Sequence, residues 1–252
     1  MNAILTVAIK EFRDGLRNRW VLACTVIFAL LAVGVAWFGA AAAGSVGWAG
    51  LATTIVSLAS LAVFLVPLIA LLLAYDSVVG EAEQGTLLLL LSYPVSRTQL
   101  LAGKFLGHGL ILGVSSALGF GAAGLAIALL SGQWNWALWA ALGRFVLSAW
   151  LLGLCFVALA YLVSVTASEK ARAAGLALIG WFFLVLVYDL ALLGLLAGTQ
   201  GGLRAELFPY LLLLNPTDVF RLINLAGFEA ARARSGLVAV AAQGLFHPTL
   251  LL

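Results

Sequence analysis

Few side chains in this sequence could do chemistry. The 252 residues include two cysteines, two histidines and one methionine. Cys24 and Cys155 stand alone in apolar runs, and His108 is far along the chain from His247, so the spacing indicates neither a disulfide framework nor a zinc site. The sequence also lacks the G-x-x-x-x-G-K-[ST] loop that cradles nucleotide phosphates and the H-E-x-x-H motif of zinc enzymes. We therefore expect no catalytic residue, no metal ligand and no cofactor on this chain.

Two ionisable residues interrupt long apolar stretches. Arg144 lies near the start of one stretch, and Asp189 lies within another. A charge at bilayer depth is costly, so it either marks a functional site or is neutralised by a partner. We expect Arg144 and Asp189 to form an intramembrane ion pair that stabilises the fold without taking part in transport.

A leucine run between residues 76 and 99 is the strongest functional signal. As a helix, Leu87 to Leu91 would extend only about 7.5 Å, whereas the hydrocarbon core of a bilayer is about 30 Å thick. Pro94 disfavours helix just before it, and Ser96-Arg97-Thr98-Gln99 has the pattern of a capping box that starts the next helix. The run predicts a short apolar helix with charged residues on both sides. Such a helix is either a docking site for a soluble partner or a re-entrant turn packed on its own bundle.

The elements that hold these residues are membrane helices. Hydrophobic residues make up 64% of the sequence and charged residues 9%, compared with roughly 25% charged residues in soluble domains. This composition excludes a soluble enzyme and a disordered protein, and a net charge of +3 is too small to indicate a nucleic-acid-binding protein. We predict an all-α membrane protein whose spans each contain about 20 apolar residues.

The apolar stretches organise residues 1–252 as a single transmembrane domain. The sequence from His247 to Leu252 resembles the first residues of another apolar helix, so we expect a sixth span beyond residue 252. The predicted segments are a cytoplasmic amphipathic helix at 1–19, spans at 20–42, 53–75, 105–130, 138–167 and 173–198, a cytoplasmic loop at 76–104 and an outer segment at 199–249.

Lysine and arginine are unequally distributed between the two sides of the membrane. The two short loops on one side carry none, whereas the other side carries Lys10, Arg13, Arg17, Arg19, Arg97, Lys104, Lys170 and Arg172. Positive charge marks the cytoplasmic side. We therefore expect a multi-pass protein of the bacterial inner membrane, with a cytoplasmic N-terminus and a periplasmic segment at 199–249.

The first residues have an amphipathic pattern. Ile4, Ala8 and Phe12 recur at helical spacing, with Leu5 and Leu16 beside them and basic residues opposite. The pattern predicts a helix that lies flat on the cytoplasmic leaflet. It is either a simple anchor or an elbow that also contacts a cytoplasmic partner.

The outer segment contains a helix start. Asn215 suits the N-cap, Pro216 the first helical position and Asp218 the first turn. The residues that follow are amphipathic, with Arg221 on the polar side. We expect an interfacial helix on the outer leaflet, with Arg221 turned outward.

Two glycine pairs, Gly103/Gly107 and Gly109/Gly113, form small-x-x-x-small patterns. Such patterns allow two helices to approach closely, so we expect these glycines to serve packing.

A set of motifs in the 76–104 loop resembles the signature of ABC-2-type permeases, the membrane subunits of ATP-binding-cassette transporters. The motifs are Glu81-x-Glu83-x-Gly85-Thr86-Leu87, Leu90-Leu91-Ser92-x-Pro94-x-Ser96-Arg97 and Gly103-Lys104. The resemblance covers most of the chain and implies a six-span fold of the type V exporter kind. It also implies a homodimer bound to two copies of a separate ATPase, which would hold ATP and Mg.

In such permeases the loop between the second and third spans carries the coupling helix. The resemblance thus implies ATPase contacts at Glu81, Glu83, Gly85, Thr86, Leu87, Leu88, Leu89, Leu90, Leu91, Ser92, Pro94 and Arg97. A second cytoplasmic turn, with Glu169, Lys170 and Arg172, is either a further contact or ordinary positive-inside charge.

Within the family, the element Asn215-Pro216-Thr217-Asp218-Val219-Phe220-Arg221 and the overall run look most like permeases of the system that assembles the copper centre of nitrous oxide reductase. That similarity implies a contact with a periplasmic partner protein at Asn215, Pro216, Asp218, Phe220 and Arg221. Copper would need a path of soft ligands, and the sequence offers no ladder of cysteine, methionine or histidine through its spans. Two roles remain for the permease: it exports a sulfur-containing or other small precursor, or it acts mechanically on the outer partner. We favour the mechanical role.

Two other classes of function remain as alternatives. A secondary carrier would need coupling-ion sites near the midplane of the membrane and usually broken helices, and only Arg144 and Asp189 could serve it. A membrane scaffold without transport would need no ATPase. Association with an ATPase subunit distinguishes both alternatives from a permease.

Overall fold

The computed structural model describes residues 3–17, 19–38, 51–131, 134, 136–198 and 208–225. Over these ranges the chain is helical and contains no strand. The elements in chain order are α1 (Ala3–Arg17), α2 (Arg19–Phe38), α3 (Leu51–Ala74), α4 (Val79–Glu83), α5 (Thr86–Ser92), α6 (Arg97–Ser131), α7 (Trp136–Thr166), α8 (Lys170–Phe182), the π-helical turn η2 (Phe183–Val187), α9 (Tyr188–Gly198), α10 (Phe208–Leu213) and α11 (Pro216–Leu225).

Within the described ranges, four helical runs are long and apolar enough to cross a membrane: Thr54–Glu83, Arg97–Leu129, Trp139–Thr166 and Lys170–Gly198. A shorter apolar helix, Thr25–Val35, lies within α2. These helices confirm the predicted all-α membrane protein. The number of spans, including the sixth beyond residue 252, stays a prediction.

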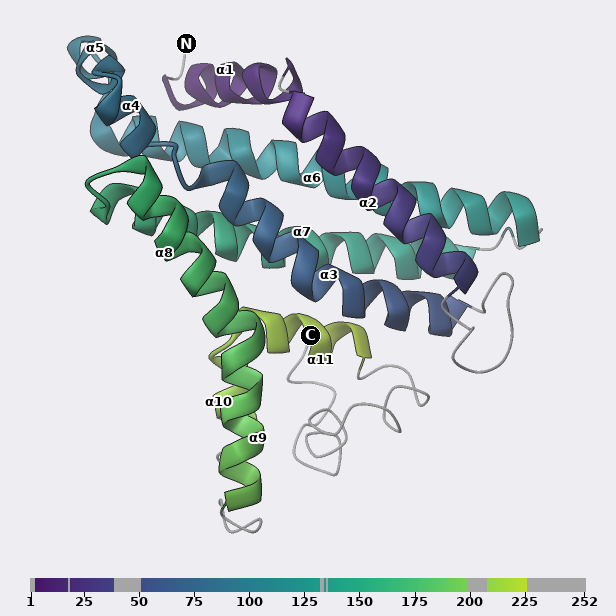
Figure 1. Cartoon of the computed structure of the whole chain (residues 1–252). Helices are drawn as coiled ribbons and strands as arrows, with labels where there is room; N and C mark the ends of the chain where they lie inside the picture. Colours follow the sequence, from purple (N-terminus) through teal and green to yellow (C-terminus); the bar gives the residue numbers. More distant parts are fainter. Residues whose placement is uncertain are drawn as a thin grey trace.

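The long helices form a bundle in which α6 and α7 run side by side and α3 packs on α7 (Figure 1). α2 packs along α6, and α1 packs along the first part of the same helix. α4 and α5 project at the end of the bundle where the N-terminus lies (Figure 1). α4 contacts α6 through Glu81 and Lys104, and α5 contacts α4 at the same end of the bundle.

Glycines in α6 set how closely α1 can approach. A Cβ atom on Gly103 would lie 2.6 Å from the Cβ of Val7, and one on Gly107 would lie 2.6 Å from the Cβ of Glu11. No side chain fits at such distances, so this pair confirms the predicted close packing. Ala8 of α1 is buried while Leu5 is 59% exposed. Part of the apolar face of α1 therefore packs on α6, and its contact with the leaflet stays a prediction.

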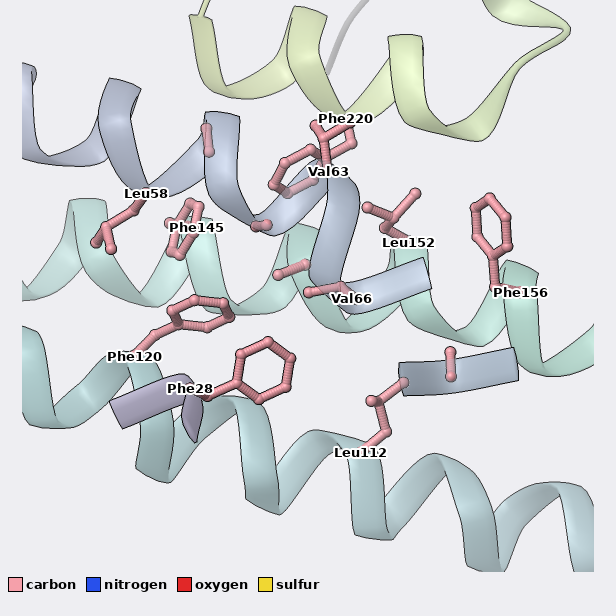
Figure 2. Packing of buried hydrophobic residues seen from close by; sticks show 14 of the residues in the cluster. Phe28, Leu58, Val63, Val66, Leu112, Phe120, Phe145, Leu152, Phe156 and Phe220 are labelled. Carbon is pink, nitrogen blue, oxygen red and sulfur yellow. The ribbon is translucent and has the colours of Figure 1, made fainter. Parts of the chain in front are cut away.

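Phenylalanine rings from four helices meet in the core (Figure 2). The ring centroids of Phe28 and Phe120 are 5.2 Å apart, and those of Phe120 and Phe145 are 4.9 Å apart. Phe145 in turn lies 6.0 Å from Phe220 of α11. These contacts connect α2, α6, α7 and α11.

The prediction of an interfacial helix over α11 is wrong, because its apolar face packs on α3 and α7. Phe220 is 2% exposed, and the side-chain amide of Asn224 donates a hydrogen bond to Ser148 Oγ at 2.9 Å. The helix start itself is confirmed, since α11 begins at Pro216 and the backbone N–H of Thr217 donates to Asn215 Oδ1 at 3.2 Å.

The predicted ion pair between Arg144 and Asp189 is also wrong. Asp189 pairs with Arg221 of α11, which also contacts Asp218 Oδ1 at 3.2 Å, while Arg144 is exposed on α7. The cause is the path of the chain after η2: α8 packs on α3 and α7, but α9 leaves that contact and diverges from the bundle (Figure 1). Arg221 is therefore turned toward Asp189 rather than outward.

The π-helical turn η2 is tied to α11 by hydrogen bonds. Asn215 Nδ2 donates to the carbonyl oxygen of Leu184 at 2.8 Å, and Thr217 Oγ1 donates to the same oxygen at 3.4 Å. A π-turn shifts the backbone hydrogen-bond register of a helix. The start of α11 thus supplies donors at the point where the helical run α8–α9 changes direction.

Candidate functional site

The short helix α5 leaves its leucines uncovered. None of its residues is buried, and Leu88 and Leu89 are 76% and 66% exposed. Tyr93, directly after the helix, is also 66% exposed. α5 is therefore not a re-entrant turn packed on the described part of its own bundle, and it presents an apolar surface, which we call the α5 patch: Leu88, Leu89 and Tyr93.

The turn between α4 and α5 needs a glycine. Gly85 has a φ of 73°, in the left-handed region, and a Cβ there would meet nothing within 4 Å. Backbone conformation rather than space thus favours glycine at this position. The Thr86 hydroxyl donates to the carbonyl oxygen of Glu81 at 3.2 Å. The turn therefore fixes how α5 leaves α4.

The capping box predicted at the start of α6 is confirmed. The backbone N–H of Gln99 donates to Ser96 Oγ at 3.2 Å, and the backbone N–H of Ser96 donates to Gln99 Oε1 at 3.0 Å. This reciprocal pair satisfies N–H groups that have no partner inside the helix. α6 consequently begins at Arg97, three residues after Pro94.

A buried lysine beneath α4 connects separate parts of this end of the bundle. Lys104 of α6 is 3% exposed, and its Nζ lies 2.7 Å from Glu81 Oε1 of α4 and 3.2 Å from Glu11 Oε1 of α1. Burial acts to raise the pKa of Glu11, but Lys104 and Lys10 outweigh it and lower the pKa. A buried ammonium needs such partners, because its desolvation is costly.

Sequence reasoning assigned no structural role to Lys104 or Glu11. The sequence pattern marks Lys104 only as a cytoplasmic positive charge and as part of a family motif. A signal was present, because Lys104 lies on the same stretch of helix as the packing glycines Gly103 and Gly107. A lysine beside a close-packing stripe is held away from open water, so its position predicts a carboxylate partner.

The second cytoplasmic turn is bound to the first loop. Lys170 Nζ lies 2.6 Å from Asp76 Oδ2, and the backbone N–H of Lys170 donates to Glu83 Oε1 at 2.6 Å. Ser164 Oγ accepts the backbone N–H groups of Val78 and Val79 at 3.0 and 3.1 Å. Glu83 and Lys170, predicted separately as partner contacts, thus meet each other. Glu169 and Arg172 are exposed.

A polar pocket of about 270 Å³ lies between α1, the end of α3, α4 and α6. Lys104 and His108 line it, together with Glu11, Asp14, Asp76 and Glu81. His108 Nδ1 lies 2.7 Å from the Tyr161 hydroxyl oxygen, so one of the two ring nitrogens of His108 has a hydrogen-bond partner within the chain. Within the described residues, no three histidine, cysteine, aspartate or glutamate side chains are placed to hold a metal ion.

The residues predicted to contact a periplasmic partner do not form an exposed surface. Asn215 is 0% exposed, and Asp218 and Phe220 are each 2% exposed. Asn215 instead donates a hydrogen bond to η2, Asp218 contacts Arg221, and Phe220 packs in the phenylalanine core. The prediction of a direct partner contact is therefore wrong for these three side chains in this structure.

Comparison with known proteins matches residues 5–246 to a family described as ABC-2 family transporter protein. A relative from Pseudomonas aeruginosa, described as a probable ABC transporter permease protein NosY, is 60% identical over 242 residues, which are 96% of this chain and 88% of the relative. A relative of the same description from Stutzerimonas stutzeri is 57% identical over 243 residues, with the same two coverages of 96% and 88%.

Proposed function

The chain belongs to the ABC-2 family of transporter permeases, and we propose that it couples ATP hydrolysis by a separate ATPase subunit to work across the membrane. The α5 patch is the observation that carries this proposal. Leu88 and Leu89 lie on a helix too short to cross a bilayer, at the end of the bundle where α1 begins (Figure 1). Covering a leucine side chain removes roughly 1.5–3 kcal/mol of unfavourable hydration.

An ATPase groove is the occupant that fits this patch. The centre of a protein interface is apolar and depleted in charge, whereas its rim is polar. In the α5 patch, Leu88 and Leu89 form the centre, while the exposed polar residues Gln84, Ser92 and Arg97 flank it in the sequence. We assign the contact to α5 and its flanks, with Glu81 and Glu83 turned instead toward Lys104 and Lys170.

The whole assembly proposed is a homodimer of this chain with two NosF-like ATPase subunits, which hold ATP and Mg, and a periplasmic NosD-like protein. This part of the proposal rests on the similarity to relatives described as NosY. We further propose an inner-membrane location with α1, α4 and α5 in the cytoplasm, because that end carries most of the lysine and arginine.

The proposed task is mechanical support of copper-site assembly in nitrous oxide reductase. Copper conduction would require soft ligands placed along the helices, and the sequence has two cysteines, two histidines and one methionine. We therefore propose that the outer partner handles the copper and that the permease acts on this partner by ATP-driven motion. Uptake of copper into vesicles that contain the purified complex, driven by ATP, would contradict this role.

Leu89→Asp tests the proposed docking. The permease is expressed with its ATPase, and the amount of ATPase that co-purifies is measured for the wild type, Leu89→Asp and the conservative control Leu89→Met. We expect Leu89→Asp to lose the ATPase and Leu89→Met to retain it. Equal recovery with all three chains would refute the contact, and no recovery with the wild type would favour a carrier or a scaffold.

A further inference from the structure

Lys104 is one point at which α4 contacts the rest of the bundle. Its side chain is 4% exposed and lies between Glu81 of α4 and Glu11 of α1, whose side chains are 19% and 12% exposed. Lys104 itself belongs to α6. One buried ammonium therefore joins a loop helix, the N-terminal helix and a long membrane helix.

The α1 side of this junction is rigid. Gly103 and Gly107 bring the backbone of α6 against α1 so closely that an added Cβ atom would lie 2.8 Å from the carbonyl oxygen of Ile4 and 3.0 Å from that of Ala8. Two helices packed at this distance move together, because sliding would force backbone atoms into contact. α1 and the first turns of α6 therefore act as one body.

The α4 side is equally constrained. α5 follows α4 after the left-handed Gly85, and the Thr86 hydroxyl is bonded to the backbone of Glu81. The carboxylate of the same residue, Glu81, contacts Lys104 at 2.7 Å. A displacement of α5 is thus carried to Glu81 and from there to Lys104.

We propose that Lys104 is a positioning residue that transmits displacement of the docked α5 to the α1–α6 body. This inference rests on the proposed function, since it requires an ATPase at the α5 patch. Separating Glu81 from Lys104 would leave the largely buried Glu81 carboxylate without its cation, so the contact holds while α5 moves. Motion of α5 therefore appears as motion of α1.

A second route leads from α4 to α8, through Glu83 and the backbone of Lys170. That route does not pass through α1. Cutting the Glu81–Lys104 contact should therefore remove the movement of α1 but leave the α8 side attached. This difference separates transmission through Lys104 from a general weakening of the loop.

The experiment uses the full chain in complex with its ATPase, with both cysteines replaced by alanine and spin labels at Arg13→Cys on α1 and Val165→Cys on α7. Both label positions are exposed. Glu81→Gln cuts the α4 arm but leaves Lys104 neutralised by Glu11. Asp14→Asn is the matched control, because Asp14 pairs with Lys10 on the exposed side of α1 and not with Lys104.

We expect ATP to shift the distance between the labels in the wild type and in Asp14→Asn. In Glu81→Gln that shift is lost, while the ATPase still co-purifies and the KM for ATP is unchanged. The kcat for ATP hydrolysis differs from that of the wild type. Lys104→Arg, which keeps the charge, retains the shift.

Two outcomes overturn the inference without touching the proposed function: an unchanged shift in Glu81→Gln, or no shift of α1 in the wild type although the ATPase is bound. Failure of the wild type to bind the ATPase overturns the proposed function itself. If Glu81→Gln is not recovered as a folded complex, Glu81→Asp keeps the charge but shortens the side chain that reaches Lys104, and a reduced shift is expected.

Discussion

The ring of Phe220 lies 6.0 Å from the ring of Phe145, so α11 contributes to the core of the bundle rather than to its surface. Phe220→Ala should therefore lower the free energy of unfolding by about 3 kcal/mol, as expected for a cavity left by a buried aromatic side chain. Ile223 on the same helix is 50% exposed. Ile223→Ala should therefore change the free energy of unfolding by no more than about 0.5 kcal/mol. Thermal unfolding in detergent compares the two. Equal effects would mean that α11 is not seated in the core.

Arg221 should be far more important for stability than Arg144. Arg221→Ala leaves the partly buried Asp189 and the buried Asp218 without the cation that both contact, which typically costs about 3–5 kcal/mol. Arg144 is exposed, so Arg144→Ala should lie within about 0.5 kcal/mol of the wild type. Thermal unfolding in detergent compares the two variants with the wild type. A large loss in Arg144→Ala would support the ion pair predicted from the sequence instead.

Gly107→Ala should separate α1 from α6. The new Cβ would lie 2.6 Å from the Cβ of Glu11 and 3.0 Å from the carbonyl oxygen of Ala8, and overpacking of this kind typically costs about 1–3 kcal/mol. Gly121→Ala on the same helix meets nothing within 4 Å. That control should be neutral or stabilising, because alanine is the better helix former. Limited proteolysis near residue 17 reports whether α1 has been released, and release in both variants would argue against a specific contact.

Gly85→Ala should misdirect α5. A φ of 73° costs an alanine about 1–2 kcal/mol relative to a right-handed conformation. Gly85→Asn should be milder, since asparagine tolerates the left-handed region better. The measurement is the affinity of the purified permease for its ATPase. We expect the order wild type, Asn, Ala from strongest to weakest, and equal affinities would show that the turn does not control docking.

The contact between Glu11 and Lys104 should fail in acid. The pKa of Glu11 is lowered from its ordinary value of 4.5 in the folded chain, because Lys104 and Lys10 outweigh the effect of burial. Its contribution to stability is therefore complete above that ordinary pKa and is lost as the pH falls through the lowered folded pKa. Melting temperatures measured from neutral pH down to about pH 3 should fall more steeply for the wild type than for Glu11→Gln. Parallel curves would contradict the pairing.

Local features of this protein could be predicted from its sequence. The capping box at Ser96 and Gln99, the N-cap at Asn215 and the close-packing Gly103/Gly107 pair all follow from residue types at fixed spacing. The all-α membrane class follows from composition, and the short leucine helix follows from a run that cannot cross a bilayer. Each of these depends on a few consecutive turns of helix and on the solvent around them.

Partners across the bundle were decided only by tertiary structure. Asp189 pairs with Arg221 and not Arg144 because the helical run changes direction at η2, a π-turn that hydrophobic spacing does not reveal. Glu11 and Glu81 meet at Lys104 because α1 packs along α6 while the chain between them passes through two further helices. Spacing along a helix indicates which face a residue occupies, but the packing of whole helices determines which charge lies opposite it.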